Sequence, residues 1–168
     1  MSNKKLVYFI GPIIIVSGIV ITINRFLDKF YFENNENCIY NDNSKIVSIN
    51  DNHSYLEKKG INENSSTDIT FKFTGMDTIW QVMSGNDTEI TIKYSSNIES
   101  GKFKVVLIDP NNNIINILEQ TQLGEGKYTI KKGTSRIKIV GSETTGNLEM
   151  DISIREDENR VDIVPINR

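Results

Sequence analysis

Residues 146–154 read GNLEMDISI, and every second residue from Leu148 to Ile154 is apolar. The residues between them are acidic or hydroxylated: Glu149, Asp151 and Ser153. Successive side chains of a β-strand point to opposite faces of the sheet. The alternation therefore predicts a strand with one buried face and one solvated face.

From residue 68 onward the chain contains eight short apolar-rich segments separated by turn residues, and nearly all of them show the same period-two pattern. They are residues 69–73, 79–83, 89–94, 103–107, 114–118, 127–131, 136–140 and 148–154. Short strands with one wet face at this spacing are typical of antiparallel sandwiches. We predict an all-β fold, an eight-stranded antiparallel β-sandwich of jelly-roll-like type, behind an N-terminal transmembrane helix.

Two of the connections predict hairpins. Asp109-Pro110-Asn111-Asn112-Asn113 separates two of the segments, and proline followed by asparagine favours a tight turn. Lys132-Gly133 joins residues 127–131 to residues 136–140, where glycine would take the left-handed position of a bulged turn.

The apolar run from Leu6 to Ile23, LVYFIGPIIIVSGIVITI, predicts a membrane anchor. As a helix it would span roughly 27 Å, close to the hydrocarbon thickness of a bilayer. A cleaved signal peptide is the alternative, because Lys4 and Lys5 precede the run. No small-x-small cleavage site follows it, and Cys38 does not lie in a lipobox, so we favour an uncleaved anchor.

The anchor divides the chain into four parts. We predict a cytoplasmic stub and transmembrane helix at residues 1–30, a flexible polar stalk at 31–67, the sandwich at 68–154 and a tail at 155–168. The stalk is rich in Asn, Glu and Ser and would bury little apolar surface. The charges flanking the anchor and the β-rich body favour a single-pass protein of the cell membrane with the body on the extracellular side.

Composition excludes several classes of function. The formal net charge is −3, which argues against a nucleic-acid partner. The single cysteine forms no internal disulfide. The single histidine, His53, lies in the predicted stalk, which argues against a metal site and against a nucleophile activated by a histidine base. We predict no cofactor.

Three segments resemble a family of proteins: SGKFKVVLIDPNNNIINILE at 100–119, GKYTIKKGTSRIKIVG at 126–141 and GNLEMDISI at 146–154. They are similar to the carboxy-terminal body of small, uncharacterised membrane-anchored or lipid-anchored envelope proteins of Gram-positive bacteria. The resemblance covers about Ile69 to Ile154. It implies a β-sandwich at the cell surface and brings no catalytic residues, and this chain departs from it in lacking a lipobox cysteine and in having Ser135 where an aromatic residue is usual.

Two candidate binding features each have a plainer interpretation. Asp109, Asn111 and Asn113 have the spacing of the oxygen ligands of calcium loops, but they lack the glycine and the distal acid of an EF-hand, and a hairpin explains the same residues. Trp80 would serve as a sugar-stacking platform, although a tryptophan between Ile79 and Val82 in a strand is more often a core residue.

The basic residues predict a third candidate. The Lys132-Gly133 hairpin would bring four cations onto one outward face: Lys127, Lys131, Arg136 and Lys138. This anion-facing patch would bind an anionic cell-wall polymer, unless acids such as Glu149 and Asp151 neutralise it. The plainer interpretation is solvated lysines that discourage edge-to-edge pairing.

The sequence thus favours a cell-surface protein whose sandwich is a binding or structural module, with an anionic envelope polymer or another envelope protein as partner. The alternative is a secreted or envelope hydrolase with an unrecognised carboxylate site. We expect no enzyme activity, because no catalytic arrangement of residues is recognisable.

Overall fold

The structure is a computed structural model, and it describes residues 23, 39–154 and 161–167. Its elements are α2 (Asn43–Ile46), β1 (Asn52–Glu63), β2 (Ser66–Ser84), β3 (Thr88–Ile108), β4 (Ile114–Glu119), β5 (Gln122–Ile130), β6 (Gly133–Ile154) and β7 (Val161–Pro165). All strand pairs are antiparallel. The prediction of an all-β antiparallel fold is confirmed.

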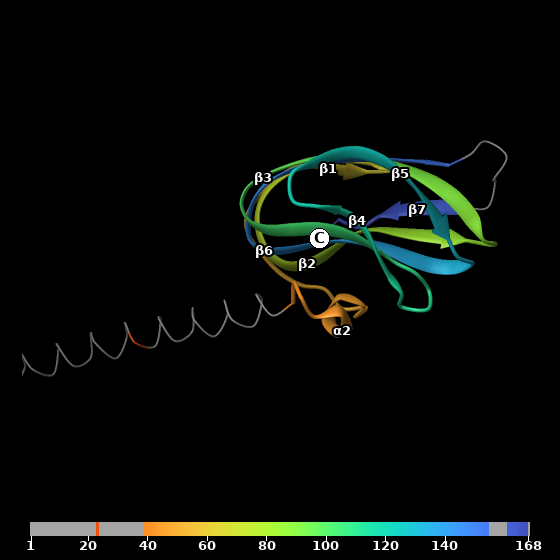
Figure 1. Cartoon of the computed structure of the whole chain (residues 1–168), viewed down its shortest axis with the longest axis horizontal. Helices are drawn as coiled ribbons and strands as arrows, with labels where there is room; N and C mark the ends of the chain where they lie inside the picture. The colour runs from red at the N-terminus through yellow and green to blue at the C-terminus, as the bar shows by residue number, and fades with distance from the viewer. Residues whose placement is uncertain (1–22, 24–38, 155–160, 168) are drawn as a thin grey trace, which may run out of the picture. The chain divides into compact units, whose positions relative to one another are not determined.

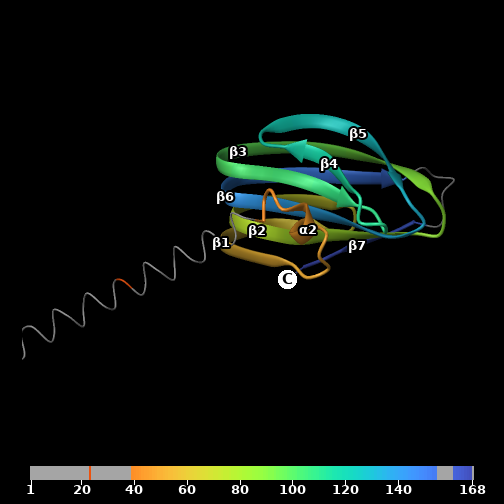
Figure 2. The same ribbon diagram turned by 60° about the horizontal axis from the view of Figure 1, so that its bottom comes forward.

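One sheet contains all seven described strands, in the order β1-β2-β6-β3-β4, with β5 also paired to β3 and β7 to β2. Figure 2 shows β1 and β5 on opposite sides of this arrangement. The three long strands β2, β6 and β3 pair along nearly their whole length.

The long strands bend in the middle, and the bend divides the sheet into two facing layers (Figure 1). Layer A consists of β1, residues 66–74 of β2, residues 142–154 of β6, residues 88–99 of β3, and β5. Layer B consists of residues 76–84 of β2, residues 133–140 of β6, residues 102–108 of β3, β4 and β7. The stacked rings of Phe71 in layer A and Phe103 in layer B, with centroids 5.0 Å apart, lie in the core between the layers.

The bends explain why the prediction of eight strands is wrong. The segments expected as separate strands on either side of Gly75, Gly101 and Gly141 are halves of β2, β3 and β6. Register shifts occur at Phe73/Gly75 and Ser100/Lys102, and Gly75 and Gly101 have φ of 108° and 79°. Positive φ and bulges bend a strand without ending its ladder of hydrogen bonds. The glycines that predict turns in the sequence therefore mark bends within continuous strands.

The segment expected to be a flexible stalk is ordered wherever the structure describes it. Residues 52–63 form edge strand β1, whose bulge at Tyr55/Glu57 interrupts the period-two pattern. Residues 39–51, here called the strap, lie on the outer face of layer B and include α2, whose N-cap is Asp42. Ile39, Tyr40 and Ile46 of the strap are buried against Met76, Val106, Ile108 and Val140. These few apolar residues are enough to hold the strap in place, because the sheet supplies the apolar surface against which they pack.

The predictions for the two ends of the chain, the tail and the anchor, have different outcomes. Residues 161–165 of the expected tail form β7 on the edge of β2. The described residues contain no helix that is long and apolar enough to cross a membrane. The predicted anchor lies outside them except for Ile23, and so does Cys38.

Candidate functional site

The outer face of layer A carries an open hollow of about 570 Å³ over β3, β5 and β6. Its lining is Lys93, Tyr94, Ser95, Leu123, Gly124, Glu125, Glu149 and Asp151. Lys93 and Ser95 are on β3, Leu123 and Glu125 on β5, and Glu149 and Asp151 on β6. On β3 and β6 their positions follow from the alternation of the strand, because Lys93, Glu149 and Asp151 alternate with the buried Ile92, Leu148, Met150 and Ile152.

The hollow combines charged and hydroxylated side chains with one prominent apolar side chain. Lys93 lies 3.7 Å from a carboxylate oxygen of Glu125, in an exposed ion pair. Asp151 lies directly opposite Lys93 on the neighbouring strand. Leu123 is 83% exposed. The hollow therefore offers hydrogen-bond donors, acceptors and an apolar surface at the same place.

This chemistry suits binding better than catalysis. A general acid in glycoside hydrolysis is a carboxyl group that a poorly solvated environment keeps protonated. Glu125, Glu149 and Asp151 are all exposed, so they lack that environment. Exposed carboxylates and an exposed ammonium group instead offer hydrogen bonds to a polar ligand.

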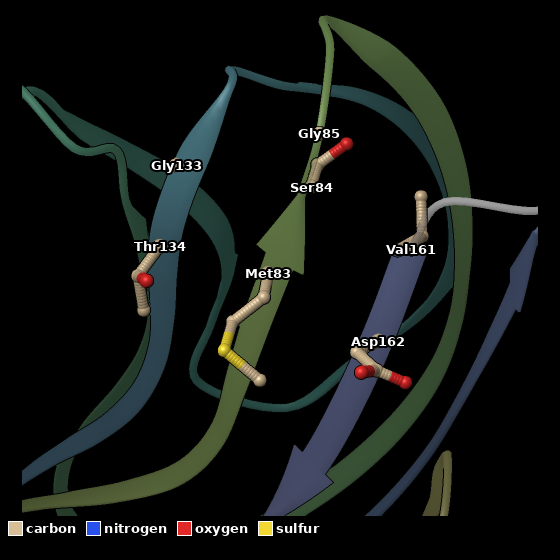
Figure 3. A pocket seen from close by; sticks show the side chains of 7 residues that line it. All are labelled: Met83, Ser84, Gly85, Gly133, Thr134, Val161 and Asp162. Atoms are coloured by element: carbon tan, nitrogen blue, oxygen red, sulfur yellow. The ribbon is translucent and has the colours of Figure 1, made fainter.

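A second hollow, of about 410 Å³, lies where β2 ends beside β6 and β7 (Figure 3). Met83 on β2 is paired on one side with Thr134 of β6 and on the other with Asp162 of β7. The lining is completed by Ser84, Gly85, Gly133 and Val161. It contains no histidine, cysteine or lysine to act as base or nucleophile, so it is the weaker candidate.

The structure does not assemble the predicted anion-facing patch. The expected hairpin is absent, since β5 pairs with β3 whereas β6 pairs with β2 and β3. Lys132-Gly133 instead crosses from layer A to layer B. The four cations are thus divided between the layers. Lys127 and Lys131 lie on β5 or directly after it, in layer A, and Arg136 and Lys138 lie on β6, in layer B.

Each of the four cations has local partners. Lys127 pairs with Glu89 at 3.0 Å and Lys131 with Asp87 at 2.7 Å, both on the surface. The other two are covered by the strap.

Lys138 is fully buried and lies 2.9 Å from the carboxylate of Asp51. It also donates a hydrogen bond to the Ser48 carbonyl at 2.7 Å. Arg136 donates to the carbonyl groups of Ser48 and Val47, and burial lowers its pKa. The alternation placed both side chains on the outward face correctly, but it could not show that the strap covers that face.

Trp80 is a core residue and is not available for stacking on a sugar. Its side chain is fully buried between the layers. Its indole nitrogen donates to the Asn64 carbonyl at 3.0 Å, which satisfies the polar atom of the ring.

The Asp109 segment is a hairpin turn, as the plainer interpretation expected. β3 pairs with β4 across it. The carboxylate of Asp109 accepts hydrogen bonds from the backbone of Asn111 and Asn113, both at 2.8 Å, and from the Asn113 amide at 2.7 Å. Among the residues that the structure describes, no cluster of His, Cys, Asp and Glu side chains is arranged to hold a metal ion.

Sequence reasoning missed a polar cluster around the buried carboxylate of Asp77, formed by side chains of β1 and β2. The carboxylate of Asp77, which is 3% exposed, accepts a hydrogen bond from the Tyr55 hydroxyl at 2.7 Å. Lys58 lies 3.4 Å and His53 3.8 Å from the same carboxylate. Burial and the nearby Asp77 raise the pKa of Tyr55. The cluster joins β1 to β2, and the sequence does not reveal it because His53, Tyr55 and Lys58 fall within the predicted stalk.

Comparison with known proteins adds little about function. No protein-family model and no curated protein matches the chain. The CBM22-1 xylan-binding domain from Paenibacillus barcinonensis Xyn10C is 11% identical, with 68% of this chain and 87% of that chain covered and a TM-score of 0.32.

Two further solved structures match at a similar level. A family 35 carbohydrate binding module from an environmental isolate is 16% identical, covers 68% of this chain and 82% of its own, and has a TM-score of 0.31. The Yersinia pseudotuberculosis-derived mitogen is 16% identical, with 70% and 100% covered and a TM-score of 0.31. Scores this low assign neither a family nor a function to this chain.

Proposed function

We propose that the sandwich is a non-catalytic carbohydrate-binding module, held at the outer surface of a membrane by the segment from Leu6 to Ile23. The observation that carries the binding site is the open hollow on layer A. Binding sites are concave and combine an apolar contact with a few placed polar groups. The hollow has both.

The lining matches the groups that a sugar presents. Sugar hydroxyl groups donate hydrogen bonds to carboxylates such as Glu149 and Asp151 and accept them from Lys93 and Ser95. The apolar C–H face of a sugar ring packs on an exposed aliphatic side chain, here Leu123. Each contact is weak in water, so affinity arises from several contacts made together.

The charge of the hollow disfavours an anionic ligand. Its lining has three carboxylates, Glu125, Glu149 and Asp151, and one ammonium group, Lys93. An anionic envelope polymer would be repelled at this face. The proposed partner is therefore a neutral polysaccharide and not the anionic polymer expected from the sequence.

The three carboxylates are also the observation that favours the hydrolase alternative, because glycoside hydrolysis uses paired carboxyl groups. Their exposure weighs against it. Incubation of the protein with a polysaccharide that it binds, followed by measurement of new reducing ends, separates the two functions. Release that is abolished by Glu149→Gln would establish a hydrolase.

Affinity electrophoresis against a panel of neutral polysaccharides, followed by calorimetry, tests the binding site. Leu123→Ser should weaken binding about tenfold, since it removes most of one apolar contact. Leu56→Ser is the matched control, because Leu56 is 88% exposed and lies outside the hollow. Equal loss in both variants, or binding to no polysaccharide, would refute the proposal.

Protease treatment of intact cells tests the membrane attachment. A body on the outer surface is cleaved from intact cells, whereas the segment before Leu6 stays protected. A body that is cleaved only after lysis would contradict the proposed orientation.

A further inference from the structure

One row of side chains crosses the whole outer face of layer A, well beyond the hollow. Leu123 lies opposite Ser95, Ser95 opposite Glu149, Glu149 opposite Asp68, and Asp68 opposite Ile61. The row takes one residue from each of the five strands of the layer: β5, β3, β6, β2 and β1. Neighbouring strands are about 4.8 Å apart, so the row is roughly 19 Å long.

The composition of the row is symmetrical. Its two ends are the exposed aliphatic side chains Leu123 and Ile61, which are 83% and 56% exposed. Its centre is polar, with Ser95, Glu149 and Asp68. Exposed aliphatic residues on a wet sheet face make no contribution to the core, and two of them in one row form a pair of apolar contacts at a defined separation.

The centre of the row carries like charges on adjacent strands. Glu149 and Asp68 are directly opposite one another, and both are exposed. The structure gives neither of them an ion pair with another described residue. Like charges in directly opposite positions destabilise a sheet. Hydroxyl groups of a ligand would donate to both carboxylates and reduce that repulsion.

The next row along the strands is polar throughout and includes Lys93, the cation that lines the hollow. Lys93 lies opposite both Glu125 and Asp151, Asp151 opposite Ser66, and Ser66 opposite Glu63. A ligand lying along the first row is thus bordered by further hydrogen-bonding groups over its full length. An extended chain fits this arrangement better than a single compact molecule.

We infer that layer A binds an extended neutral oligosaccharide laid across all five strands, with one apolar contact at Leu123 and a second at Ile61. The inference rests on the proposed carbohydrate-binding function and adds the length of the ligand and a second contact on β1. A disaccharide is too short to reach from Leu123 to Ile61, whereas a hexasaccharide is long enough.

Calorimetry with the full chain in detergent and with cello- and xylo-oligosaccharides, from the disaccharide to the hexasaccharide, tests the inference. For the series that binds, affinity should rise with length and become constant once the ligand spans the row. Ile61→Ser should weaken binding of the hexasaccharide about tenfold and leave the affinity for the disaccharide unchanged. Leu123→Ser should weaken binding of both oligosaccharides.

Leu56→Ser is the matched control for Ile61→Ser, because Leu56 is also an exposed aliphatic residue of β1 and does not belong to the row. If Leu123→Ser weakens binding but Ile61→Ser has no effect at any length, the five-strand site is wrong and the proposed function stands. If neither series binds, the inference fails, and the panel of neutral polysaccharides decides the proposed function. A change in sedimentation mass caused by Ile61→Ser, with unchanged affinity, would mean that the row contacts a second copy and would also overturn the inference.

Discussion

The ammonium group of Lys138 lies 2.9 Å from the carboxylate of Asp51, and both side chains are buried where the strap crosses layer B. A buried ion pair is costly to break from one side, because the remaining charge stays in a poorly solvated place. Lys138→Met should therefore lower the free energy of unfolding by about 3–5 kcal/mol.

The double variant Lys138→Met with Asp51→Asn is the control for that prediction. It removes both charges, so it should be more stable than Lys138→Met alone. Urea denaturation of the wild type, both single variants and the double variant gives the coupling energy between the two sites. A coupling energy of zero would show that the pair does not hold the strap.

Acid should weaken the same contact. Burial opposes ionisation of Asp51, but hydrogen bonds from Lys138 and Thr78 outweigh it and lower the pKa of this carboxyl group. A lowered folded-state pKa adds stability above the unfolded pKa of about 4, and this stability is lost as pH falls through the folded-state value. The wild type should lose more stability than the double variant between about pH 6 and pH 3 in urea denaturation. Equal losses would contradict the prediction.

The fluorescence of Trp80, the single tryptophan, should report the core and be insensitive to ligand. Because the side chain is fully buried, its emission should be blue-shifted and poorly quenched by iodide in the folded protein. Addition of a bound oligosaccharide should leave the spectrum unchanged. A ligand-induced shift or protection from iodide would mean that Trp80 lies in the binding site.

The strap and β1 should be required for folding. A fragment of residues 39–168 should be soluble and unfold cooperatively, since it keeps every described contact of the sandwich. A fragment of residues 68–168 should aggregate, because it exposes the apolar residues of layer B that the strap covers and removes edge strand β1. Circular dichroism and sedimentation of the two fragments decide this, and a folded 68–168 fragment would restore the boundary expected from the sequence.

The bend at Gly75 should tolerate no side chain. Gly75 has a φ of 108°, and a Cβ atom there would lie 2.1 Å from the Asn52 carbonyl oxygen. Gly75→Ala should therefore destabilise the fold by more than about 1 kcal/mol, by forcing β1 away from β2. Thr70→Ala is the control at an exposed position of the same strand. Thermal unfolding of both variants tests the prediction, which fails if the two midpoints are equal.

The sequence by itself determined the strand class of this protein and the inward or outward direction of most side chains. Alternation placed Phe71, Phe103 and Ile137 in the core, and they are buried there. It also placed Glu149 and Asp151 on the solvated face. These properties are local, since the direction of a side chain in a strand depends on the parity of its position.

Tertiary structure alone decided which strands are neighbours, and with them the candidate site. Gly75 and Gly101 signal a change of direction, but a bend and a turn have the same local residues, and only the pairing of β2 and β3 with β6 distinguishes them. The row from Leu123 to Ile61 joins residues from five strands, so it exists only once the register is set. Arg136 and Lys138 face outward as expected, yet the strap buries them, because burial depends on what covers a face and not on the strand that forms it.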